Sequence, residues 1–78
     1  MNETDVSREA KGALSNAISE AAQGDRIIYH TGQHCGGVHR ADASAAHAAG
    51  LVLLVQRRSQ TPGVFEYMAV RTKKDARA

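Results

Sequence analysis

Ten side chains in the second half of the sequence have the chemistry to hold a nucleic acid. Arginine and lysine neutralise phosphates and release counterions, and small polar side chains on a helix or turn can approach base edges. The set consists of Arg40, Ser44, His47, Arg57, Arg58, Gln60, Thr61, Arg71, Lys73 and Lys74. The same cations would also keep a pair of strands soluble, since charged residues commonly protect the edges of sheets. The sequence leaves both interpretations open.

The formal charge gathers toward the C-terminus. The net charge is +2, but residues 1–25 carry two cations against five acids, and residues 26–50 carry two cations against one acid. Residues 51–78 carry six cations against two acids, a net charge of +4. An anionic partner would meet that end of the protein first.

A second group of potential ligands contains the four histidines and the single cysteine. Thiolate and imidazole groups suit zinc, so the candidate metal ligands are His30, His34, Cys35, His39 and His47. Their spacing is not that of a zinc motif, because there is no paired C-x-x-C and adjacent His34 and Cys35 point apart in most backbones. A small structural zinc site is therefore only an alternative, and we expect no cofactor.

Cys35 beside His30 or His39 would also form a nucleophilic pair. A catalytic thiol needs a lowered pKa, an orienting partner and a pocket. The sequence indicates neither the pocket nor a third group, and a chain of 78 residues leaves little room for them. We therefore predict no catalytic residues and a protein that is not an enzyme.

The elements that position these side chains begin with a long N-terminal helix. Within residues 5–22, apolar positions recur at three- and four-residue steps, which places them on one helical face. Thr4, Asp5 and Ser7 are candidate caps at its start, and Gly24 fits the left-handed position past its end. The β-branched and aromatic residues 26–30 then predict a short strand.

A glycine loop and a second helix follow. Residues 31–37 contain three glycines, too many for a stable helix. Residues 42–50 predict a short alanine-rich helix with Asp42 as its N-cap and Gly50 as its terminator.

The strongest pattern is a C-terminal β-hairpin. Two eight-residue runs, residues 51–58 and 64–71, are rich in β-branched, leucine and aromatic side chains and flank a connector that contains a Pro and a Gly. With residues 59–63 as the loop, Arg58 faces Val64 and both faces of the hairpin are partly apolar. We expect the helices to cover one face and a second subunit to cover the other.

The length and composition bound the class of protein. With 78 residues there is room for one small domain, and we expect disordered tails at residues 1–4 and 73–78. The lone cysteine excludes an internal disulfide, and we find neither a signal-peptide pattern nor an apolar run that would span a membrane. We therefore expect a cytoplasmic protein without membrane contact.

The order of helix, strand, glycine loop, alanine-rich helix and hairpin resembles a winged helix. Residues 42–50 take the place of the recognition helix and residues 51–71 that of the wing, although the usual helix between the first strand and the recognition helix is absent. The resemblance implies an α+β fold with a three-stranded antiparallel sheet. Residues 24–32, 54–58 and 65–71 are also similar to segments of small phage and prophage proteins of unassigned role.

Two functions from different classes follow. The leading hypothesis is a phage-derived regulator that binds nucleic acid, DNA rather than RNA, through the alanine-rich helix and the hairpin tip. The alternative is a protein-interaction module or inhibitor that binds a protein partner through the exposed face of the hairpin. A homodimer would suit both, because a two-fold pair doubles the basic surface while burying Leu51, Leu53 and Phe65.

Overall fold

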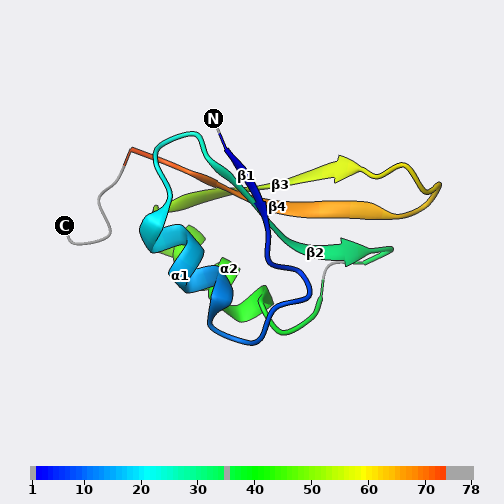
Figure 1. Ribbon diagram of the computed structural model, residues 1–78, viewed down its shortest axis with the longest axis horizontal. Coiled ribbons are helices and arrows are strands. Elements are labelled where there is room, and N and C mark those ends of the chain that lie inside the picture. The colour runs from blue at the N-terminus through cyan, green and yellow to red at the C-terminus, as the bar shows by residue number, and fades with distance from the viewer. Residues whose placement is uncertain (1, 35, 74–78) are drawn as a thin grey trace.

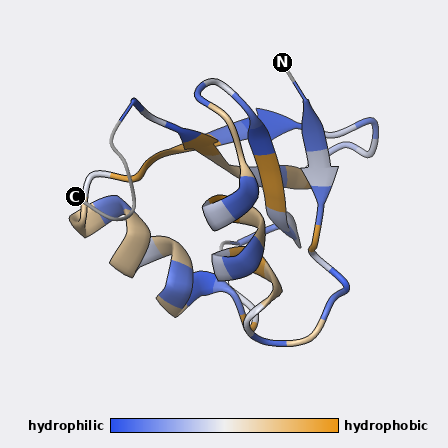
Figure 2. Ribbon diagram, turned by 60° about the vertical axis from the view of Figure 1, so that its left-hand side comes forward, coloured by the Kyte–Doolittle hydropathy of each residue, from blue (hydrophilic) through white to orange (hydrophobic). Residues whose placement is uncertain are grey.

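The computed structural model describes residues 2–34 and 36–73. Its elements are β1 (Glu3–Asp5), α1 (Ala13–Glu20), β2 (Arg26–Gly32), α2 (Arg40–Ala48), β3 (Val52–Arg58) and β4 (Phe65–Arg71). The strands form one sheet in the order β1-β2-β4-β3, in which β1 runs parallel to β2 and the other neighbours are antiparallel. Both helices lie on one side of this sheet (Figures 1 and 2). The other side, which no described helix covers, is called the open face below.

The core lies between the helices and the sheet. Leu14 and Ile18 are four residues apart on α1 and are 0% and 3% exposed, so a single turn presents both to the strands. The small side chains of Ala43 and Ala46 are the buried part of α2 and let that helix approach the sheet closely. Full burial of a side chain such as Leu14 contributes about 1.5–3 kcal/mol to folding.

The α+β class is confirmed, but the long N-terminal helix is wrong. The Oδ1 atom of Asp5 accepts hydrogen bonds from the backbone nitrogen and the hydroxyl of Ser7 (2.9 and 2.6 Å), which turns the chain where a helix was predicted to start. Gly12 then has φ of +99°, a left-handed conformation that a right-handed helix cannot contain. The helix therefore begins at Ala13 and has eight residues.

The predicted three-stranded antiparallel sheet is also wrong, because residues 3–5 add a fourth strand. Glu3 pairs with Arg26 and Asp5 with Ile28 in parallel, so the sheet is mixed. Glu3 and Thr4 thus belong to a strand, although the sequence placed them in a disordered tail; most of the predicted C-terminal tail lies outside the described residues. The predicted pairing of the early strand with the hairpin is confirmed by β2 and β4.

The hairpin forms as predicted, but its strands pair one residue away from the predicted register. Arg58 pairs with Phe65 rather than with Val64. The reason is that the backbone nitrogen of Ser59 donates a hydrogen bond to the carbonyl of Val64 (3.0 Å), so the ladder continues to Ser59 and shortens the turn.

This one-residue shift exchanges the two faces of β4 relative to those of β3. Leu53 pairs with Val70, and Val55 pairs with Met68, so all four side chains share the open face. The sequence had grouped Met68 and Val70 with Val52, which is in fact 1% exposed beneath the helices.

The second helix begins before its predicted cap. It starts at Arg40 with His39 at the N-cap position, so Asp42 lies in its first turn, where its negative charge still favours the helix N-terminus. Gly50 has φ of +79° and ends the element as predicted. No helix among the described residues is long and apolar enough to cross a membrane.

The start of the first strand is held by polar contacts. The Asp25 carboxylate accepts backbone hydrogen bonds from Asn2 (3.0 Å) and Ala22 (2.9 Å), and these bonds lower the pKa of Asp25. The Glu3 carboxylate accepts hydrogen bonds from the guanidinium of Arg57 (2.9 and 3.2 Å), which lowers the pKa of Glu3. Both carboxylates therefore fasten the start of β1 to the rest of the sheet in their ionised form.

We predict that acid loosens β1 before the rest of the sheet. A lowered pKa in the folded state means that the stabilisation is present above the unfolded pKa of about 4 and is lost as the pH falls through the folded value. The amide of Val6, which donates to the carbonyl of Ile28 (2.9 Å), should therefore lose its hydrogen-exchange protection as the pH is lowered from about 6 to about 3. Glu3→Gln should lower that protection already at neutral pH. Protection of Val6 that stays constant over this range would contradict the prediction.

Candidate interaction surface

The exposed members of the predicted nucleic-acid set do not share one surface. Arg40, Ser44 and His47 are exposed on α2, whereas Gln60 and Thr61 are exposed in the hairpin turn. The turn projects from the end of the sheet that is farther from α2 (Figure 1). The remaining exposed members are Arg58 at the end of β3 and Lys73 after β4, and Lys74 lies outside the described residues.

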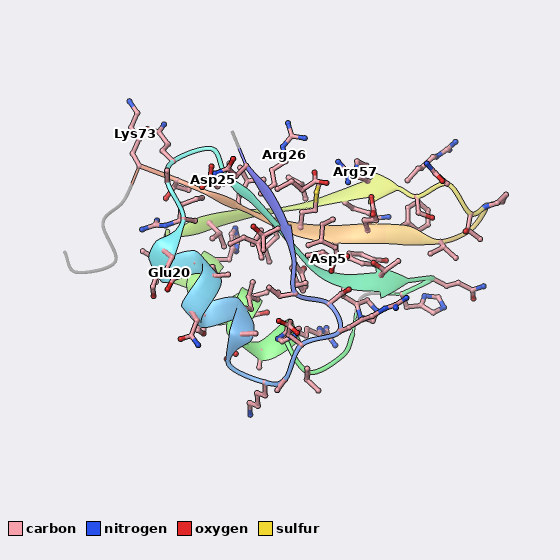
Figure 3. All side chains as sticks on the ribbon, viewed as in Figure 1. Asp5, Glu20, Asp25, Arg26, Arg57 and Lys73 are labelled. Atoms are coloured by element: carbon pink, nitrogen blue, oxygen red, sulfur yellow. The ribbon has the colours of Figure 1, made fainter. Side chains whose placement is uncertain are left out.

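Arg57 is engaged by two carboxylates on the open face. Its Nη1 atom lies 2.9 Å from Oε1 of Glu3, and its Nη2 atom lies 2.8 Å from Oε1 of Glu66. The hydrogen bonds to Glu3 and then to Glu66 raise the pKa of Arg57 above its ordinary value. Because Glu3 is on β1 and Arg57 on β3, the ion pair spans the two central strands of the sheet. Figure 3 shows Arg57 and Arg26 on the side of the sheet opposite the helices.

Arg71 is a structural residue of the core. It is 8% exposed, and its Nε and Nη1 atoms donate to the backbone carbonyls of Ile18 (3.1 Å) and Leu51 (3.0 Å). The side chain thus ties the end of α1 to the start of the hairpin. Burying a guanidinium is costly unless it is hydrogen-bonded in this way.

The predicted metal ligands are not gathered into a site in the described part of the chain. No group of three or more His, Cys, Asp or Glu side chains among the described residues could hold a metal ion, and Cys35 lies outside those residues. The ring of His30 packs against the glycine loop instead, where its Nε2 atom lies 2.9 Å from the carbonyl of His34. A Cβ on Gly37 would come within 2.9 Å of the same ring, so this glycine permits the close approach.

His39 is the most unusual polar residue of the described chain. It is 1% exposed, and neither of its ring nitrogens has a hydrogen-bond partner among the described residues. Leaving a buried polar group without a partner costs about 1–3 kcal/mol. It occupies the N-cap position of α2, next to the glycine loop, but its side chain makes no capping hydrogen bond.

A polar hollow of about 480 Å³ lies beside the open face and has no metal-binding geometry. It is lined by Asp5, Ser7, Arg8, Glu9, Thr31 and Glu66. Its acidic side chains belong to no group of potential ligands among the described residues that could hold a metal ion. The carboxylates of Asp5 and Glu66 already have partners in Ser7 and Arg57.

Three consecutive apolar side chains of β3 are exposed to solvent. Among the large hydrophobic side chains, Leu53, Leu54 and Val55 are 57%, 36% and 39% exposed. These three consecutive residues are called the β3 edge patch. They extend over both sides of the strand, because Leu53 and Val55 point to the open face and Leu54 to the helix side.

The backbone of β3 is unpaired along the same edge. Since β3 is the last strand of the sheet, only its β4 side is paired. Ser59 donates to Val64, and Thr72 donates to the carbonyl of Leu51, so the odd-numbered residues of β3 bond to β4. Because bonded and non-bonded pairs alternate in an antiparallel ladder, the amides and carbonyls of the even-numbered residues point away from the sheet. These outward residues are Val52, Leu54, Gln56 and Arg58.

The other edge of the sheet has the features that usually prevent strand pairing. The strand β1 has three residues, two of them acidic, and all three are exposed. Short, charged edges are the common protection against unwanted pairing. The strand β3 has seven residues and is free of Pro and Lys, and its two Arg residues stand only at its end. The two edges therefore differ in their capacity to accept another strand.

The sequence reasoning predicted an apolar hairpin face but missed the edge. Of the residues expected in a homodimer, Leu51 and Phe65 pack against the protein's own core, whereas Leu53 is exposed. Leu54 was overlooked, because its exposure depends on β2 pairing with β4 rather than with β3. The unbroken apolar run of residues 51–55 was the available signal, since a strand with one solvated face alternates.

Comparisons with protein-family models, with curated proteins and with solved structures found no match for this chain. They therefore leave the resemblance to winged-helix and phage proteins without support or contradiction.

We predict that His39→Leu keeps the fold and raises its stability. Removing the unpartnered ring nitrogens relieves their desolvation cost, so the free energy of unfolding should rise by about 1 kcal/mol. Chemical denaturation monitored by circular dichroism measures this change. His39→Asn is the matched control, because it keeps a buried polar group and should not be stabilising. A loss of stability in His39→Leu would show that the imidazole has a polar role that the fold needs.

Proposed function

We propose that this protein is a small protein-interaction module whose β3 edge accepts an extended strand from a protein partner. The observation that carries the proposal is the coincidence of the β3 edge patch with a row of outward-facing backbone groups. In this mode of recognition, main-chain hydrogen bonds supply affinity, and the side chains on alternate positions supply specificity. The edge offers both along seven residues.

The partner strand would contact apolar side chains on both of its faces. On the open face it would cover Leu53 and Val55, and on the helix side it would cover Leu54. Removing these side chains from water favours association by roughly 25 cal/mol for each Å² of apolar surface, before the cost of ordering the partner.

Nucleic-acid binding stays a prediction that this geometry supports less well. Arg57 is held by Glu3 and Glu66, and the side chain of Arg71 is directed to carbonyls of its own core. The exposed cations of the predicted nucleic-acid set that remain are divided between α2, the end of β3 and the segment after β4. Binding of a short duplex at low salt, where phosphate contacts are strongest, is the test of this second hypothesis.

The cytoplasm is the compartment that we propose for this interaction. The chain has a single cysteine, as is common for proteins that do not depend on disulfides for stability.

We predict that a proline at position 56 weakens strand capture without unfolding the sheet. The amide of Gln56 points away from β4, so its loss leaves the hairpin ladder intact, whereas a partner strand would meet a ring in place of a donor. The probe is a fluorescent synthetic peptide with the sequence of residues 51–59, and the measurement is fluorescence anisotropy. Gln56→Pro should weaken binding at least about tenfold, a loss of roughly 1.4 kcal/mol.

Gln56→Ala is the matched control, because it removes the same side chain but keeps the amide. It should bind the peptide as the unaltered protein does, and circular dichroism should show that both variants are folded. The proposed function would be wrong if the peptide failed to bind at concentrations of about 1 mM, an affinity limit of roughly −4 kcal/mol, or if Gln56→Pro bound it unchanged.

A further inference from the structure

We infer that the partner strand is β3 of a second copy of this chain, paired antiparallel about a two-fold axis at Leu54. The inference rests on the proposed function, since it names the occupant of the same edge. The result would be a continuous sheet of eight strands, in which both copies contribute the same surface, as a two-fold interface requires.

Charge selects the antiparallel direction. Both cations of β3, Arg57 and Arg58, stand at its C-terminal end. In a parallel pair in register each arginine would lie beside its own copy, and like charges directly opposite are destabilising. An antiparallel pair instead places the two arginine pairs at opposite ends of the interface.

The backbone restricts the antiparallel register, and apolar pairing selects among the registers that remain. The outward groups belong to even-numbered residues, and an axis at any residue of β3 pairs them with one another. The axes that lie within the β3 edge patch are at Leu53, Leu54 and Val55. With the axis at Leu54, Leu53 faces Val55 of the other copy and Leu54 faces its own copy. With the axis at Val55, Leu53 would face Arg57, and Leu54 would face Gln56. An axis at Leu53 would also give apolar pairs, but it would place Val55 opposite Leu51, outside β3, and would pair only residues 52–54 of the two strands. The axis at Leu54 covers the whole β3 edge patch with apolar side chains and pairs residues 52–56.

The same register gives Arg58 a partner of opposite charge. Residue 58 then lies opposite residue 50 of the other copy, just beyond the last turn of α2. Arg58 points to the helix side of the sheet, because it alternates with the buried Val52. The carbonyls at the end of a helix carry partial negative charge and favour a nearby cation. This charge complementarity occurs twice in the dimer.

Cysteine cross-linking tests both the dimer and its register. In a Cys35→Ser background, Leu54→Cys should form a disulfide-linked dimer under mild oxidation, since Cα atoms of a hydrogen-bonded pair lie about 5.5 Å apart. Gln56→Cys is the matched control. Its two copies would be four residue steps apart, roughly 13 Å, which is too far for a disulfide. Equal yields from both variants would indicate parallel pairing, and a higher yield from Val55→Cys would place the axis there; either result overturns the inference.

Measurement of molecular mass over a concentration series tests the affinity, and a charge reversal tests the helix contact. Arg58→Glu should weaken the dimer by about 3- to 30-fold, because two favourable helix-end contacts are lost. Arg40→Glu makes the same change of net charge at the other end of α2 and should leave the dimer unchanged. Equal effects of the two variants would exclude the specific contact of Arg58.

The outcomes separate the inference from the proposed function. A chain that stays monomeric while the peptide of residues 51–59 binds to the β3 edge retains the function and refutes the second copy as partner. A chain that stays monomeric and does not bind the peptide refutes both.

Discussion

A strand at the end of a sheet has one row of backbone donors and acceptors without partners in its own sheet, and β3 combines this row with apolar side chains. The row alone is common, because water satisfies it. Leu53, Leu54 and Val55 make water a poor neighbour along the same edge, and nothing in the described part of β3 interrupts the strand. Natural sheets usually protect such an edge. The lack of protection on β3, together with its presence on β1, is the feature on which our account of the molecule depends.

The charged residues of the sheet form ion pairs and hydrogen bonds with groups of the same chain, away from the exposed apolar part of β3. Arg57 joins Glu3 and Glu66 across the central strands, and the buried Ile28 and Met68 of the open face lie in those same strands. Arg71 is buried in the core, where its hydrogen bonds link α1 to the hairpin. At the centre of the open face, the ion network therefore covers the apolar side chains, whereas the β3 side of that face remains apolar and exposed.

The sequence predicted elements better than it predicted their arrangement. The hairpin, the strand at residues 26–30 and the alanine-rich helix have strong local signals, and each is present. The N-terminal helix failed because periodicity alone does not reveal that Asp5 turns the chain or that Gly12 takes a left-handed conformation. Hairpin register depended on one hydrogen bond of Ser59, a detail that no pattern of residue types specifies.

The candidate surface was only half predictable for the same reason. Apolar residues of the hairpin were recognisable, but whether they face a neighbouring strand or solvent is decided by the strand order. Likewise, the arginines were recognisable as cations, but their roles depend on partners distant in sequence, such as Glu3 for Arg57. Pairing over such separations is a property of the fold and leaves no local mark.

Residue-resolved hydrogen exchange of the β3 amides is the most direct test of the central claim, because it distinguishes the two rows of the strand. In dilute protein the odd-numbered amides should be protected by β4, while those of Val52, Leu54, Gln56 and Arg58 exchange freely. As the protein concentration rises, the even-numbered amides should gain protection together, since a second strand would bind all of them at once. Even-numbered amides that exchange freely at every concentration, and also in the presence of the β3 peptide, would contradict the claim that this edge accepts a strand.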